Sequence, residues 1–108
     1  MKYLKTYEEK KRVTFKEWLK DHPQDINTTE IQCDNENLID LDGVQEFKNL
    51  KELSCRDNNL TSLNLEGLDK LEELWCSNNK LPYEDLEGYW EWFAKEYPDR
   101  WEAKKFNF

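Results

Sequence analysis

Three cysteines are the residues whose chemistry and spacing stand out first in this sequence. Cys33, Cys55 and Cys76 lie 22 and then 21 residues apart, and each ends an apolar-x-Cys triplet that alternates like one face of a strand. In stacked parallel strands the thiols would form a column with a step of about 4.8 Å, which could suggest a metal site or a disulfide. The alternative is an inward column, where cysteine is a small buried hydrophobe with a raised pKa. Because a fourth ligand is missing, we favour the structural column without metal or cofactor. Unpaired thiols also favour a reducing, cytoplasmic compartment.

Catalytic groups are scarce. The single histidine, His22, precedes Pro23 and is expected to end a helix. We find no Ser–His–acid set, phosphate-binding loop, zinc-protease motif or dinucleotide fingerprint. Carboxylates are abundant, but without the signature of a pocket they do not identify an acid–base pair. The sequence therefore predicts that this protein is not an enzyme.

The Asp- and Asn-rich stretch DNENLIDLDG at residues 34–43 has the look of a calcium loop. It lacks the regular D-x-D-x-D-G spacing and the distant bidentate glutamate that such a loop requires. We expect these residues to form turns instead.

Length, composition and charge restrict the remaining function classes. The chain has 108 residues, 15 of them aromatic, so it has room for one folded domain and is not a disordered acidic segment. No apolar run is long enough to span a membrane, and residues 1–12 do not resemble a secretory signal. The net charge of −8 divides into +2 for residues 1–25, −11 for residues 26–98 and +1 for the last ten. This acidic middle disfavours nucleic-acid binding and favours a partner with a basic surface, although solubility alone could also explain it.

The cysteines mark an internal repeat. Residues 50–68 read LKELSCRDNNLTSLNLEGL, and residues 71–81 read LEELWCSNNKL. Both resemble the leucine-rich-repeat consensus L-x-x-L-x-(L/C)-x-x-N-x-L, and the Cys-x-x-N-N-x-L form is similar to short bacterial, internalin-like repeats. The resemblance covers residues 28–86. It implies an α/β fold, a short right-handed leucine-rich-repeat solenoid with about three parallel strands on the concave face and N- and C-terminal helical caps.

Asparagines and leucines of the repeat have predicted positions. Asn58 and Asn79 follow the strands, where an inward amide can bond buried backbone groups of the turn. The first repeat is degraded, because Glu36 replaces this asparagine and Gly43 replaces Leu65. Either neighbouring asparagine could serve instead of Glu36, with a shifted turn. Val44 would then help to fill the space that Gly43 leaves.

A solenoid needs a cover at each open end. Within the single domain 1–108 we expect a cap at residues 1–25, repeats at 26–86 and a second cap and tail at 87–108. The motif TFKE, from Thr14 to Glu17, predicts a capping box for the first cap. In the second, Glu84 or Asp85 is expected to start a helix that runs to about Tyr97. Its aromatic face seals the last repeat, Trp92 is expected to be the exposed aromatic, and the segment from Trp101 to Phe108 is expected to fold back.

The strand register predicts three columns of side chains on the concave face, which we take as the candidate partner-binding surface. They are Glu30, Glu52 and Glu73; then Gln32, Ser54 and Trp75; then Asp34, Arg56 and Ser77. Like charges directly opposite on neighbouring strands are destabilising. A column of three glutamates therefore indicates either a site for a basic partner or a solvated face with the charges splayed apart.

Trp75 is the strongest single candidate for a contact residue. The repeat does not require an aromatic there, since the same column holds Gln32 and Ser54. An exposed Trp beside acidic groups has the composition of an interface hot spot. The alternative is that Trp75 packs on the C-terminal cap.

These observations predict a non-catalytic module that binds a partner protein through its acidic concave face. The family resemblance implies protein–protein interaction, usually without a cofactor, and does not name the partner. The alternative hypothesis is a small acidic inhibitor, such as a phage-type anti-defence decoy, that blocks a basic nucleic-acid-binding protein. A homo-oligomer is compatible with either hypothesis.

Overall fold

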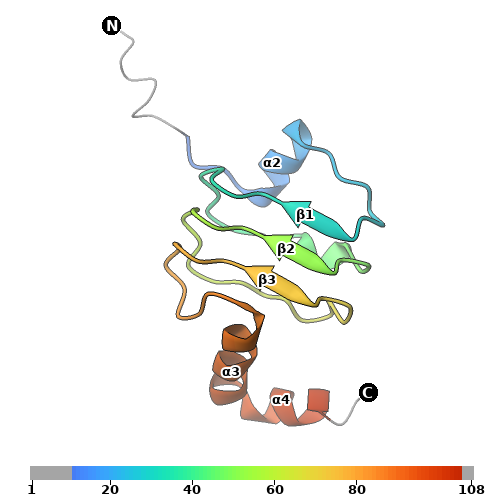
Figure 1. Ribbon diagram of the computed structural model, residues 1–108, viewed down its shortest axis with the longest axis vertical. Coiled ribbons are helices and arrows are strands. Elements are labelled where there is room, and N and C mark those ends of the chain that lie inside the picture. Colours follow the sequence, from blue (N-terminus) through green and yellow to red (C-terminus); the bar gives the residue numbers. More distant parts are fainter. Residues whose placement is uncertain (1–10, 106–108) are drawn as a thin grey trace, which may run out of the picture.

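The first described helix, α2 (Phe15–Asp21), covers one end of the molecule (Figure 1). Its N-cap is Thr14, whose hydroxyl accepts the backbone N–H of Glu17 while the Glu17 carboxylate accepts the Thr14 N–H, as the capping box predicts. This second bond is the main reason why the pKa of Glu17 lies below its usual value. Phe15 and Trp18 are buried and seal the first repeat.

The computed structural model describes residues 11–105. Residues 1–10 of the expected first cap and residues 106–108 of the expected tail lie outside this range.

Three short strands form one parallel sheet in the order β1-β2-β3 (Figure 1): β1 (Glu30–Gln32), β2 (Glu52–Ser54) and β3 (Glu73–Trp75). Their central residues are aligned and almost completely buried: Ile31, Leu53 and Leu74. The ladder continues one residue beyond the strands, since the Cys33 N–H donates to Ser54 O and the Cys55 N–H donates to Trp75 O, both at 2.8 Å. The predicted register is confirmed.

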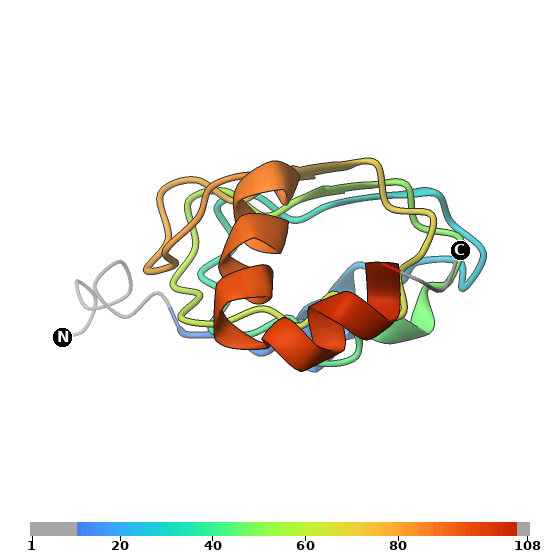
Figure 2. The ribbon, with the colours of Figure 1, turned by 90° about the horizontal axis from the view of Figure 1, so that it is seen from below.

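After each strand the chain turns and returns along the opposite side of the molecule (Figure 2). The first return contains the 3-10 helix η1 (Val44–Glu46). Gly43 precedes it with φ of 103°, in the left-handed region that glycine adopts without strain. Val44 is 1% exposed and fills the core as Leu65 does in the next return, which confirms the predicted compensation.

Asparagine side chains bind the turns together at the ends of the strands. Asn58 Nδ2 donates to the carbonyl oxygens of Cys33, Cys55 and Arg56, while its Oδ1 accepts the N–H groups of residues 36 and 38. Asn79 repeats the arrangement one turn later, with Leu60 N–H as the donor to its Oδ1. Both predicted roles are confirmed, because each amide satisfies backbone groups that would otherwise be orphaned.

In the first turn, Glu36 stands where the later turns have Asn58 and Asn79. The Glu36 N–H is bound by Asn58 from the following repeat. Asn37 has the left-handed φ of 59° and donates through Nδ2 to the carbonyl oxygen of Lys11 at 2.7 Å. Val13 then forms a parallel bridge with Leu38, so the N-terminal segment completes this turn.

The helix α3 (Leu86–Glu96) crosses the open end beyond β3, and the helix α4 (Pro98–Lys105) follows it (Figures 1 and 2). Asp85 is the N-cap of α3 and accepts the Gly88 N–H at 2.8 Å. Tyr97 is the C-cap. The start and end of this helix are as predicted, but Pro98 begins another helix as well as ending α3, in keeping with its tolerance at the first helical position.

The aromatic face of α3 closes the core of the last repeat. Tyr89 and Phe93 are 1% and 2% exposed. The prediction for Trp92 is wrong: its ring packs against Tyr83 at 5.3 Å between centroids. Among the described aromatic residues the exposed one is Tyr97. The reason is that Tyr83, on the loop before α3, turns inward and gives Trp92 a surface to cover.

Trp101 confirms the fold-back for residues 101–105, the described part of the closing segment. Its ring lies 5.9 Å from that of Trp90 on α3, centroid to centroid. Lys104, which is also on α4, lies over the Trp90 ring, with its Nζ 4.8 Å from the ring centroid. The observed fold is thus an α/β solenoid of three parallel strands with a helical cap at each end.

Candidate functional site

Three glutamates line up across the sheet, as predicted. Glu30 is aligned with Glu52, and Glu52 with Glu73. Glu30 and Glu73 are exposed, and Glu52 is half-buried. Within residues 11–105 none of the three forms an ion pair, and the Glu30 carboxylate accepts one hydrogen bond, from Gln32 Nε2 at 2.7 Å. The sheet face therefore carries a row of carboxylates that no cation among the described residues pairs with.

The side chains of the second column are not all exposed. Gln32 is exposed, but Ser54 is only 6% exposed. The Ser54 hydroxyl donates to Asp34 Oδ1 at 2.7 Å, and the same oxygen accepts the Arg56 N–H at 2.8 Å. Ser54 as a contact residue is therefore a wrong prediction, because its small side chain is covered and its hydroxyl is used to hold the turn.

The third column lies just past the strands. Asp34 and Ser77 are half-buried, and Arg56 is exposed. The guanidinium carbon of Arg56 lies 5.6 Å from the Trp75 ring centroid, a distance at which a cation is attracted to the ring face. The second and third columns are thus joined by a side-chain contact that the register alone does not reveal.

Trp75 is half-buried at the C-terminal edge of the sheet. Its backbone forms an antiparallel bridge with Asp85, immediately before α3. Within the described residues its ring makes no aromatic pair with the C-terminal cap, whose rings pair among themselves. The cap thus holds the Trp75 backbone, while the ring lies beside Arg56 on the sheet face.

The cysteine column is part of the core. All three thiols are 0% exposed and unpaired. Burial raises the pKa of Cys33 and of Cys76 to about 12, and it raises the pKa of Cys55 still further. The Cys33 thiol donates to Ser54 O at 3.4 Å. In the part of the chain from 11 to 105, no group of three or more His, Cys, Asp or Glu is arranged to hold a metal ion.

The acidic stretch at residues 34–43 is used in turns. Asp34 binds Ser54 and Arg56 as described above, and Asp40 Oδ1 accepts the N–H groups of Phe15 and Asp42, each at 3.1 Å. These bonds tie the first turn to neighbouring segments, and they give the carboxylates of Asp34 and Asp40 a structural role within the turns. His22 is the C-cap of α2, and its ring stacks on Trp18 at 4.7 Å.

The comparisons with known proteins identify the repeat. The family model described as Leucine Rich repeats (2 copies) matches residues 48–89. Residues 48–89 of this chain are therefore leucine-rich repeats. Nothing among the curated proteins or the solved structures matches it in the corresponding searches.

Proteins with leucine-rich repeats generally mediate protein–protein interaction. The described residues between 11 and 105 include no helix with the length and apolar character needed to cross a bilayer. The family therefore gives a coarse function, and the sheet face supplies the candidate surface.

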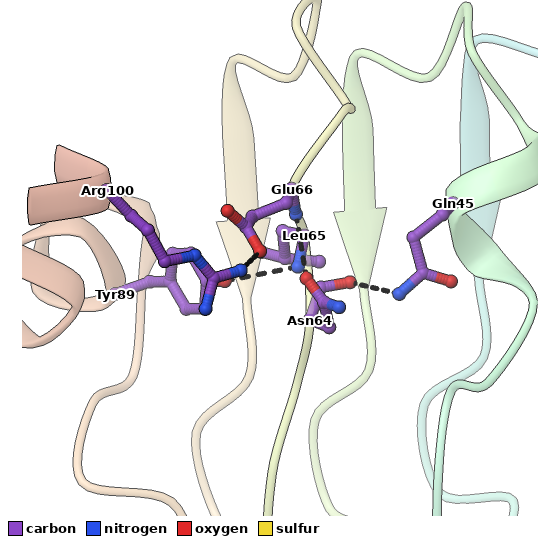
Figure 3. A network of polar contacts seen from close by, with 6 residues as sticks. All are labelled: Gln45, Asn64, Leu65, Glu66, Tyr89 and Arg100. Atoms are coloured by element: carbon purple, nitrogen blue, oxygen red, sulfur yellow. Dashed lines mark hydrogen bonds and ion pairs between the residues drawn. The ribbon is translucent and has the colours of Figure 1, made fainter. Parts of the chain in front are cut away.

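A second polar arrangement lies on the return side of the molecule, where the sequence predicted no site (Figure 3). The Tyr89 hydroxyl accepts the Leu65 N–H at 3.1 Å. Arg100 on α4 forms an ion pair and hydrogen bond with Glu66. Gln45 Nε2, from the preceding return, donates to Asn64 O at 2.6 Å. These residues come from η1, the second return, α3 and α4, so no local motif could have signalled the arrangement.

Proposed function

We propose that this leucine-rich-repeat protein is a non-catalytic interaction module that binds a partner protein with a basic surface through its acidic sheet face. The observation that carries the proposal is the aligned row Glu30, Glu52 and Glu73, which has no ion-pair partner among residues 11–105. Like charges on adjacent strands oppose folding, and a bound cationic surface would remove this cost.

Trp75 supplies the apolar part of the proposed contact. A Trp side chain at the edge of a charged surface can contribute a large buried area on binding, about 150–250 Å². Its neighbour Arg56 already shows that a guanidinium fits against this ring. The proposed contact residues are those of the predicted columns without Ser54: Glu30, Gln32, Asp34, Glu52, Arg56, Glu73, Trp75 and Ser77.

The experiment is affinity capture from a lysate of the source organism, followed by calorimetry with the purified partner. The test variant is Trp75→Ala/Glu73→Lys. The matched control is Glu46→Lys, the same charge reversal on η1, away from the sheet. We expect the control to bind as wild type does. The double variant should lose about 30-fold or more in affinity, since truncating one hot-spot residue costs about 2 kcal/mol or more. Equal binding by both variants would exclude the sheet face.

A decoy of a basic nucleic-acid-binding protein is the second candidate function, and the same unpaired carboxylates favour it. The two functions differ in how binding responds to salt. A decoy held mainly by charge should lose affinity steeply between 50 and 200 mM salt, because the Debye length falls from about 14 Å to about 7 Å over this range. A contact centred on Trp75 should change little. Competition by nucleic acid for the captured partner would support the decoy.

A further inference from the structure

A groove of about 340 Å³ lies on the return side of the molecule, away from the face of the sheet. The helices α3 and α4 line it together with the first and second return segments. Trp92 and the exposed Tyr97 contribute aromatic surface, and Asp42 and Gln45 contribute polar groups from the first return. The volume suits one large side chain or a small molecule.

The groove has a negative formal charge. Its lining contains two carboxylates, those of Asp42 and Glu66, and one cation, Arg100. Arg100 is paired with Glu66. Asp42 is exposed, and within residues 11–105 its carboxylate has neither an ion-pair partner nor a hydrogen bond. One carboxylate of the groove is therefore available to an incoming cation.

Arg100, whose pairing with Glu66 is drawn in Figure 3, shows which chemistry fits at one end of this groove. Its guanidinium carbon lies 4.8 Å from the ring centroid of Tyr97 and 5.6 Å from that of Phe93, while the guanidinium binds the Glu66 carboxylate. The protein thus holds its own guanidinium between an aromatic surface and a carboxylate. A second aromatic ring and a second carboxylate, those of Trp92 and Asp42, also line the groove, and Trp is the most favourable ring for a cation.

We propose that this groove binds an arginine side chain presented by a basic partner protein. An apolar occupant would desolvate Asp42 without compensation, and an acidic occupant would meet a net negative lining. A planar guanidinium can stack on Trp92 and donate two hydrogen bonds to Asp42, which a lysine ammonium cannot match. This proposal concerns a different face from the sheet and does not depend on the glutamate row.

The test uses the whole protein labelled with ¹⁵N and records the indole N–H resonances of its tryptophans. The probe is N-acetyl-arginine methylamide, and the matched probe is the citrulline analogue, which is nearly isosteric and uncharged. We expect arginine to shift the Trp92 resonance saturably, in the millimolar range, and citrulline to leave it unchanged. The Trp92→Phe variant assigns the resonance.

The variants are Asp42→Asn and, as a control, Glu72→Gln, an exposed carboxylate next to β3. We expect Asp42→Asn to weaken the arginine titration about two- to fivefold, the size of an exposed ion pair, and Glu72→Gln to leave it as in wild type. A Trp92 resonance that stays unshifted, or that shifts equally with citrulline, would overturn the proposal. So would a shift confined to Trp75, which would place the arginine on the sheet face and leave the proposed function standing.

Discussion

The side-chain amide of Asn58 donates at 2.9 Å to the carbonyl oxygen of Cys33, one repeat earlier in the chain. It also donates to the carbonyl oxygen of Cys55 in its own repeat, at 3.0 Å. A single buried side chain therefore ties two successive turns of the solenoid together. These hydrogen bonds explain why an asparagine, whose amide both donates and accepts, stands at this point of the repeat.

Replacing Asn58 by Ala should be among the most destabilising single changes in the chain. It removes five hydrogen bonds and leaves buried backbone groups without partners, so we expect a loss of about 3 kcal/mol or more in the free energy of unfolding. Asn79→Ala, at a half-buried position with four such bonds, should cost less. Urea denaturation followed by circular dichroism measures both. Equal losses would show that the additional bond and deeper burial of Asn58 add nothing.

Stability should fall as the pH rises above about 9. The pKa of Cys33 and Cys76 is about 12 in the folded protein, against an ordinary value near 9. Between these values the folded state keeps its thiol protons while the unfolded state loses them, so folding binds protons and is weakened by alkali. Each such thiol contributes a slope of about 1.4 kcal/mol per pH unit. Urea midpoints at pH 7, 9 and 10 measure the effect, and Cys33→Ala should reduce the slope. A midpoint independent of pH over this range would contradict the assignment.

The positions that the sequence predicted correctly are those set by a local pattern. The apolar alternation around Leu53 and the turn asparagine Asn58 each depend on only a few neighbouring residues, so the register and the inward thiols could be inferred. The capping box at Thr14 is local as well. The burial of Ser54 was not predicted because it depends on Asp34, twenty residues away. The packing of Trp92 was not predicted because it depends on Tyr83, which turns inward to meet it.

The return-side groove could not be predicted for the same reason. Arg100 and Glu66 are 34 residues apart and meet only because α4 folds back along the second return. Neither residue belongs to the repeat consensus. A contact of this kind depends on where Pro98 starts the second helix, and charge patterning along the chain gives no sign of it.

The hydroxyl of Tyr89 should contribute measurably to stability. It accepts the N–H of Leu65 inside the core, where both residues are 1% exposed. Tyr89→Phe preserves the ring and leaves that N–H without a partner, so we expect a loss of about 1–3 kcal/mol. Tyr97→Phe is the matched control, because Tyr97 is 40% exposed and should change stability by less than about 0.5 kcal/mol. Thermal unfolding of the two variants side by side gives the comparison, and equal melting temperatures would refute the role of the bond.

Repulsion within the glutamate row should lower the free energy of unfolding, and neutralising the central residue, Glu52, should recover part of that loss. Glu52 is flanked by both Glu30 and Glu73, whereas each of these faces only one neighbour. Glu52→Gln removes two like-charge contacts and keeps the side-chain shape, so we expect a gain of about 0.2–1 kcal/mol at low salt. Because the repulsion is screened, the gain should shrink at 1 M salt. Glu46→Gln, on η1, should give no comparable gain. If Glu52→Gln is stabilising but weakens capture of the partner, the row is retained for binding; if it destabilises, the three carboxylates do not repel one another and the argument for a cationic partner loses its basis.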